Sequence, residues 1–145
     1  MKTDRQTEIA AAELVLVLGS LIRRFRAAAP CEMHKLSWTQ RSVLFRLEKC
    51  GPHTAAELAR AEGVKSQSMA TVILSLEKLG FLKRNPHPTD GRRVNIALSA
   101  KGKAMRADAR KAKQTWIMQA MEKLTPKEQQ TLLSAGSVIK KLLDL

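Results

Sequence analysis

The segment Asp90-Gly91-Arg92-Arg93 opens directly into Val94-Asn95-Ile96-Ala97-Leu98, and Lys83-Arg84-Asn85-Pro86-His87-Pro88 precedes it. Apolar side chains alternate along the segment that begins at Val94, which predicts a strand, while the prolines and Gly91 predict a tight turn. We therefore expect a β-hairpin with two arginines at its tip. Guanidinium groups on a narrow projection suit a narrow anionic groove, so double-stranded DNA is the expected partner.

Two short helices are predicted immediately before this hairpin. Thr54-Ala55-Ala56-Glu57 is a capping box, and the helix that it starts is expected to stop at Gly63. After a very short turn, residues 66–79 carry apolar side chains at helical spacing and end at Gly80. Two such helices followed by a hairpin form a winged helix-turn-helix, with the hairpin as the wing.

Longer helices are predicted on both sides of this unit, and side-chain caps mark the starts of three of them, at Ser37, Ser99 and Thr125. They are expected over residues 7–29, from Ser37 to Gly51, over 101–121, and from Thr125 to Leu145. The predicted fold class is therefore mainly α with a small β-hairpin wing, in which a winged helix-turn-helix lobe is joined to N- and C-terminal dimerisation helices.

The terminal helices carry more apolar surface than a small DNA-reading core needs. Residues 14–18 are apolar nearly all round, and the last helix adds leucines, Val138 and Ile139. A helix of this kind must be covered on more than one side, which favours a homodimer built from the chain ends. The alternative is that these helices wrap their own domain.

The composition fits one domain that acts on an anionic partner. The 145 residues are 44% hydrophobic, and 26 Lys and Arg against 13 Asp and Glu give a formal net charge of +13. Such a charge points to an anionic polymer or membrane surface. The most apolar run, residues 10–22, contains Glu13 and is too short to span a bilayer. Two cysteines without a secretory segment favour the cytoplasm.

The order of these motifs resembles the multiple-antibiotic-resistance regulator (MarR) family of winged-helix transcription factors. The resemblance covers nearly the whole chain, and the segments that carry it are Leu36-Ser37-Trp38-Thr39-Gln40 with Val43-Leu44, Thr54-Ala55-Ala56-Glu57-Leu58-Ala59, Leu76-Glu77-Lys78-Leu79-Gly80-Phe81-Leu82-Lys83-Arg84, and Asp90-Gly91-Arg92-Arg93 running into Ile96-Ala97-Leu98-Ser99-Ala100-Lys101-Gly102. It implies a single domain over 1–145, with dimerisation helices in 1–33 and 101–145 and a DNA-binding lobe in 34–100. It also implies a homodimer on a pseudo-palindromic operator that represses transcription until a small molecule or an oxidant loosens the complex.

The candidate DNA contacts fall into three groups. In the major groove we expect the recognition helix, where Gln67 can pair with adenine. In the minor groove we expect Arg92 or Arg93, one of which Asp90 can hold by a bidentate pair. The remaining candidates are Ser66, Ser68, Thr71 and Ser75 on the recognition helix, and Arg41, Lys65, Lys83 and Arg84 for phosphate contacts.

The recognition helix departs from the family pattern in two ways. Lys65 stands where many relatives carry a Ser or Thr cap, so capping must shift to Ser66 or be lost. The exposed face also lacks the usual arginine. Base discrimination is therefore expected to rest on small polar side chains.

No catalytic constellation or cofactor motif is visible, so we expect a protein that is not an enzyme and has no cofactor. The family default is a small aromatic or amphipathic effector, held near Trp38, Phe25 or Met33. Cys31 and His34 offer an alternative, a redox or metal response, although the absence of tyrosine argues against the organic-peroxide sensors of the family. Two rival functions also fit the charge and the fold, an architectural protein that coats DNA by charge alone and a protein-interaction module.

Overall fold

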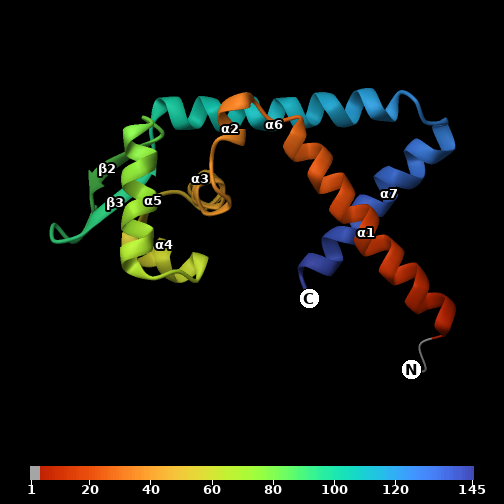
Figure 1. Cartoon of the computed structure of the whole chain (residues 1–145), viewed down its shortest axis with the longest axis horizontal. Helices are drawn as coiled ribbons and strands as arrows, with labels where there is room; N and C mark the ends of the chain where they lie inside the picture. The colour runs from red at the N-terminus through yellow and green to blue at the C-terminus, as the bar shows by residue number, and fades with distance from the viewer. Residues whose placement is uncertain (1–3) are drawn as a thin grey trace.

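A long helix, α6, spans the molecule and connects two dissimilar parts (Figure 1). The computed structural model describes residues 4–145, so the first three residues of the expected 1–33 segment lie outside it. At one end of α6 lies the winged lobe; α7 starts from the other end and runs back beneath α6, whereas α1 slants away from the middle of α6. The elements are α1 (Arg5–Ala27), α2 (Cys31–His34), α3 (Trp38–Cys50), β1 (His53–Thr54), α4 (Ala55–Glu62), α5 (Ser66–Lys78), β2 (Leu82–Pro86), β3 (Val94–Leu98), α6 (Ala100–Met121) and α7 (Pro126–Leu143).

Three helices begin with the capping boxes that the sequence predicts. Ser37, Thr54 and Thr125 each accept a hydrogen bond from the backbone amide three residues later. In each case the side chain at that third position accepts one from the cap's own amide in return. Because these bonds satisfy amides that lack a helical partner, the starts of α3, α4 and α7 follow directly from local sequence.

The wing belongs to a three-stranded antiparallel sheet in the order β1-β3-β2. β2 and β3 pair along their full length, from Leu82 opposite Leu98 to Pro86 opposite Val94. The third strand, β1, places His53 opposite Ile96 and was not predicted. It is only two residues long, so it has no alternating pattern by which a sequence reading could detect it.

The hydrophobic core lies entirely in the lobe and in the helices that border it. Its fully buried side chains come from α3, α4, α5 and β3, and they are Val43, Leu44, Leu58, Met69, Ile73, Leu76 and Ile96. By contrast, α1 and α7 contain no buried residue. The mainly helical fold with a small wing is therefore confirmed, and the two terminal helices stand outside its core.

The first turn of α6 is fixed tightly to the lobe. The Ser99 amide donates to the Phe81 carbonyl at 3.0 Å, and the Ser99 hydroxyl donates to the Gly80 carbonyl. A Cβ atom on Gly102 would overlap the Phe81 carbonyl oxygen, so only glycine fits there. Further along, buried Arg106 donates to Glu48 of α3 at 2.8 Å. The lobe and this end of α6 thus form one packed unit.

The chain between the first helix and α3 differs from the expected pattern. α1 ends at Ala27, two residues before the expected end. The ring of Pro30 disfavours helical backbone at the residue before it, so the helix cannot continue to Ala29. Cys31 begins the four-residue helix α2, which the sequence analysis did not predict. Over the described residues, none of the helices combines the length and the apolar character that a membrane crossing demands.

Candidate nucleic-acid interface

The first half of α5 presents a polar, uncovered face. Ser66, Gln67, Ser68 and Thr71 are exposed, while Met69, on the opposite face, is buried in the core. The Thr71 hydroxyl donates to the Gln67 carbonyl at 3.2 Å, and the Gln67 amide group makes no hydrogen bond within the described residues. These residues therefore form a surface of donors and acceptors at which base edges can be read.

Ser75 is not part of this exposed face, contrary to the sequence interpretation. It is half-buried, donates to the Val72 carbonyl at 2.7 Å, and accepts from Gln40 Nε2 of α3 at 2.8 Å. Helical spacing does place Ser75 near the stripe of Ser68 and Thr71, but the start of α3 covers the helix there. Its role is to join α5 to α3.

The start of α5 lacks a side-chain cap. Lys65 occupies the N-cap position with extended backbone and makes no capping bond, so the cap is lost and does not shift to Ser66. Amides in the first turn of α5 are left to be satisfied by solvent or a ligand. A helix start of this kind, with a lysine beside it, favours an anion such as phosphate.

Asp90 shapes the wing by binding backbone, and the expected pair with an arginine side chain is absent among the described residues. Its Oδ1 accepts from the Arg92 amide at 3.0 Å, and its carbonyl accepts from the Arg93 amide at 3.0 Å. An aspartate side chain commonly accepts a hydrogen bond from the backbone amide two residues later. This bond does not require a long arginine side chain to be held in one position, so it forms in place of the pair. His87 Nδ1 also accepts from the Asp90 amide, at 3.2 Å.

The two wing arginines have different environments. Arg93 extends back to α4 and pairs with Glu57 at 3.2 Å. Bonds from the Thr54 backbone and hydroxyl, with a smaller contribution from the Arg93 charge, hold the pKa of Glu57 below its ordinary value. Both arginines are exposed, but Arg92 makes no side-chain bond within residues 4–145. The sequence spacing did not indicate which of the two arginines enters the minor groove. In the structure Arg93 is paired with Glu57 of the lobe, which leaves Arg92 as the candidate.

The four candidates for phosphate contacts are scattered. Lys65 and Lys83 are exposed, and Lys83 lies on the sheet face opposite to that of Arg84. Arg84 is bound through two nitrogens to Glu77 of α5, at 2.6 and 3.2 Å, which raises its pKa. Arg41 is half-buried on α3, and its Nε has no partner in the described residues.

Arg41 instead belongs to a group of cations between α1, α3 and α6, which the sequence reading missed. We call Arg26, Arg41 and Lys113 the cation cluster. Burial lowers the pKa of Lys113 most, and the charges of Arg106, Arg26 and Arg41 lower it further. These residues come from segments far apart in the chain, so no local pattern could reveal them.

Of the three residues expected to hold an effector, only some lie beside the cation cluster. Trp38 is exposed and lies under the Arg26 guanidinium, which is 4.4 Å from its ring centroid. Phe25 packs edge-on against Trp116 of α6, with centroids 5.4 Å apart. Met33 is buried in the core. Trp38 and the cation cluster therefore form one surface with an aromatic ring beside positive charges, whereas Met33 is not accessible there.

The alternative redox or metal response through Cys31 and His34 gains no support from the surroundings of these residues. Cys31 is an exposed free thiol, and His34 is exposed at the end of the same short helix. In residues 4–145, no three His, Cys, Asp or Glu side chains gather as a metal site requires. Nothing near Cys31 thus points to either chemistry.

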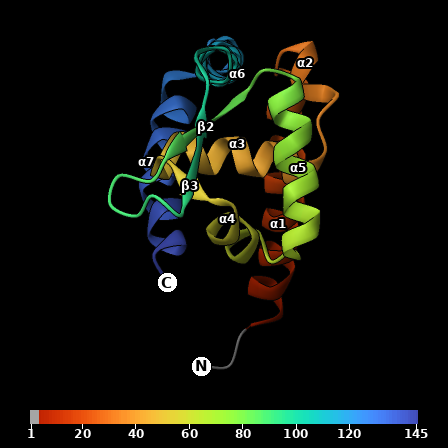
Figure 2. The same ribbon diagram turned by 90° about the vertical axis from the view of Figure 1, so that its left-hand side faces the viewer.

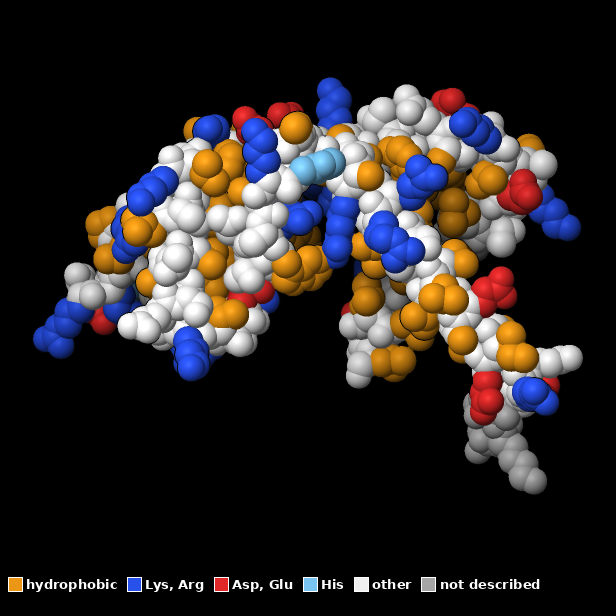
Figure 3. Space-filling model, in the orientation of Figure 1, with side chains coloured by type: hydrophobic (Ala, Val, Ile, Leu, Met, Phe, Trp, Pro, Cys, Tyr) orange, Lys and Arg blue, Asp and Glu red, His pale blue; other side chains and the backbone are white. Residues whose placement is uncertain are grey.

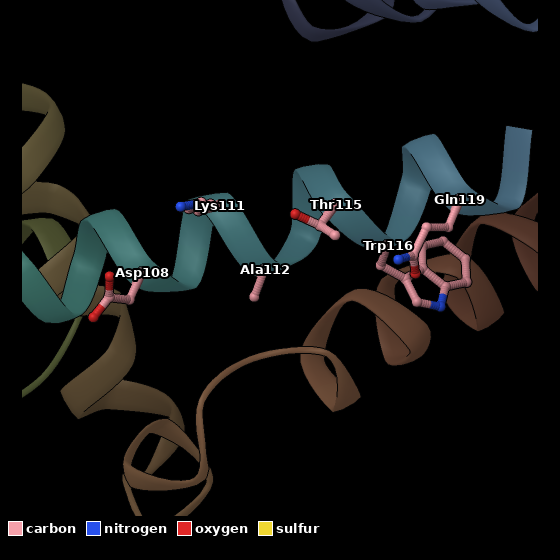
Figure 4. A pocket seen from close by; sticks show the side chains of 6 residues that line it. All are labelled: Asp108, Lys111, Ala112, Thr115, Trp116 and Gln119. Carbon is pink, nitrogen blue, oxygen red and sulfur yellow. The ribbon is translucent and has the colours of Figure 1, made fainter.

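A hollow of about 400 Å³ along α6 is lined by side chains of that helix alone, from Asp108 to Gln119 (Figure 4). Since no second element contributes side chains to it, we treat it as an open groove and not as a ligand site.

A capped helix, an exposed polar helix and an arginine-tipped wing together define a winged helix-turn-helix DNA-binding protein. The model of the MarR family matches residues 36–94, the lobe itself. An uncharacterised HTH-type transcriptional regulator of Mycobacterium leprae is 35% identical over 134 residues, which is 92% of each chain. The chain belongs to the MarR family and is a DNA-binding transcriptional regulator.

Solved structures agree with this fold. A transcriptional regulator from Thermotoga maritima superposes with a TM-score of 0.79 at 18% identity, covering 94% of this chain and 95% of its own. A MepR variant of S. aureus bound to an oligodeoxyribonucleotide gives 0.69 at 15% identity, covering 92% and 97%. At such identities the likeness concerns the fold.

Proposed function

We propose that the protein binds a pseudo-palindromic operator as a homodimer, represses transcription in the cytoplasm, and is released by a small effector. The proposed contact with DNA rests on the difference between the two arginines of the wing. Arg93 is anchored to Glu57 while Arg92 beside it is exposed and unpaired in the described chain. α5, whose first half carries the exposed polar residues, lies in the same lobe as the wing strands β2 and β3 (Figure 2).

In this proposal the two elements read different grooves. α5 enters the major groove, where the Gln67 amide pairs with adenine and Thr71 contacts base edges or a thymine methyl. Arg92 enters the minor groove, whose narrow stretches concentrate negative potential. Lys65, Lys83 and Arg84 supply phosphate contacts, which set affinity and register but do not read bases.

The wing assignment is tested by replacing Arg92. Arg92→Ala should weaken operator binding by about 1–3 kcal/mol in a mobility-shift titration, with the dimer intact. Arg5→Ala, on the exposed start of α1, serves as the matched control and should bind like the wild type. Unchanged affinity for Arg92→Ala would show that the wing does not contact the minor groove.

Sequence-specific recognition is separated from charge-driven coating by a competitor. At fixed salt, a specific regulator should prefer its operator over a scrambled duplex by about a thousandfold or more. An architectural protein would bind both duplexes equally, and a protein-interaction module would bind neither.

The homodimer is supported by the apolar side chains along α1 and α7. In Figure 3, hydrophobic side chains lie along the diagonal arm at the lower right, which is α1 in Figure 1. The exposed apolar residues of these two helices are Ile9, Leu14, Val15, Leu16, Val17, Ile22, Leu132, Leu133, Val138, Ile139, Leu142 and Leu143. A monomer does not keep so much apolar surface in water, so a second copy is the partner that we propose.

The effector that we propose is a small aromatic acid held at the cation cluster. Burial lowers the pKa of Lys113 most, and the charges of Arg106, Arg26 and Arg41 lower it further because like charges repel. A bound carboxylate would relieve this repulsion. Trp38, exposed beside Arg26, offers a ring for stacking. The surface connects to α5 through Gln40, which caps α3 and donates to Ser75.

Benzoate and uncharged benzamide are suitable probes. Benzoate should lower operator affinity of the wild type, and Arg41→Gln should remove most of that response. Benzamide should have little effect on either protein. An equal response to both probes would contradict a role for the cations.

Repression itself is tested with a promoter fusion, whose output should rise when the regulator is deleted.

A further inference from the structure

A second hollow, of about 610 Å³, lies between the wing sheet, the end of α3 and the first half of α6. In Figure 2, β2 and β3 run up to α6 with α3 beside them. Neither Arg41 nor Lys113 lines this space, so it is distinct from the cation cluster. Its volume is in the range of cavities that hold small molecules.

The hollow carries an excess of positive charge. Lys83 of β2 and Lys103 and Arg110 of α6 line it, against the single carboxylate of Glu48. That carboxylate is already paired with Arg110 and, at 2.8 Å, with Arg106. Lys83 and Lys103 form no salt bridge in residues 4–145. Two ammonium groups from different elements thus face one space without a counter-charge.

The remainder of the lining is apolar or neutral. Leu47 and Leu98 are buried side chains that form an apolar floor, together with Ala97. Asn85 adds an amide beside Lys83. A ligand that fits this lining carries a short apolar part for the floor and negative charges for the two lysines. A concave space also suits a small molecule better than the convex backbone of a duplex.

We propose that this hollow binds a small organic dianion, either a phosphate monoester or a dicarboxylate. Its charged groups lie between Lys83 and Lys103, and its apolar part rests on Leu47 and Leu98. The two lysines come from the wing and from α6, so the ligand joins these elements. Lys83 is also the side chain proposed for a phosphate contact, but binding at this place is measured without DNA, so its failure is distinguishable from failure of the proposed function.

The test is calorimetric titration of the full chain without DNA, at low salt and pH 8. Phenyl phosphate and phthalate are the dianionic probes, and benzenesulfonate presents the same ring with one charge. At least one dianion should bind, about tenfold more tightly than benzenesulfonate, because each charge-assisted contact adds about that factor. The dianion that binds identifies the ligand class.

Variants place the binding within the molecule. Lys103→Gln should weaken it about tenfold, and Ala107→Phe, which fills the hollow from the exposed side of α6, should abolish it. Lys111→Gln removes the same charge from a side chain of α6 that does not line this hollow and should bind normally. The proposal is overturned if neither dianion binds, if Lys111→Gln weakens binding as much as Lys103→Gln, or if Lys113→Gln abolishes binding while Lys103→Gln does not.

Discussion

The winged lobe and the terminal helices contain similar apolar residues but use them in opposite ways. In the lobe, Leu44, Leu58 and Leu76 are 0% exposed, whereas Leu16 of α1 and Leu133 of α7 are 71% and 61% exposed. Hydrophobic periodicity predicts that one face of a helix packs against another apolar surface, but it does not show whether that surface belongs to the same chain or to another. In the lobe the chain covers itself, and in the terminal helices the cover that we propose is a second chain.

The largest effect is expected from charging the terminal helices. Leu16→Glu with Leu133→Glu should produce monomers in sedimentation analysis and reduce operator affinity by at least about a hundredfold. Each buried leucine contributes about 1.5–3 kcal/mol, and a dimer loses two from each subunit. Gln130→Glu adds a charge to the polar side of α7 and should remain dimeric. A double variant that sediments as a dimer would show that these leucines face something else.

The next largest effect distinguishes two leucines on one helix. Leu76 of α5 is fully buried, whereas Leu74 is 50% exposed. Leu76→Ala should lower the free energy of unfolding by about 2–5 kcal/mol, since it leaves a cavity in the lobe. Leu74→Ala should change it by less than about 0.5 kcal/mol. Denaturant titration measures both, and similar losses would contradict the core described for the lobe.

A pair of glycines tests the junction between the two regions. Gly102→Ala should cost about 2 kcal/mol or more, because the methyl group overlaps the Phe81 carbonyl where α6 meets the lobe. Gly136→Ala, on α7 with open space around it, should be neutral or raise the free energy of unfolding by up to about 1 kcal/mol. Thermal unfolding of both variants is the measurement. A stabilised Gly102→Ala would mean that α6 is not packed so closely.

The smallest effect concerns a carboxylate inside the lobe. Burial acts to raise the pKa of Glu62, but hydrogen bonds from Ser42 and Arg46 and the Arg46 charge outweigh it and lower the pKa below 4.5. The resulting stability is present above pH 4.5 and is lost as the pH falls through the lowered value. Glu62→Gln should therefore cost about 1 kcal/mol at about pH 7 and less in acid. The exposed Glu8→Gln is the control, and a difference independent of pH would contradict the assignment.

The features that could be predicted from the sequence are those set by near neighbours. Capping boxes, the glycine that ends α4 and the proline-bounded wing each depend on a few consecutive residues, and all were found at the expected positions. The pairing of Arg93 with Glu57 joins residues thirty-six positions apart, and the cation cluster joins three helices. Such contacts depend on packing, so neither the placing of Arg41 nor the two-residue β1 could be inferred.

The uninterrupted helix α6 acts mechanically as a lever. Its 22 residues span about 33 Å, and its first turn is locked to the lobe. A tilt of about 6° at the far end would displace the lobe by about 3.4 Å, which is the rise of one base pair along a DNA strand. In the proposed homodimer, recognition of paired half-sites would therefore require a precise angle at the end of α6 far from the lobe, because a small rotation there would move a recognition helix out of register by one base pair.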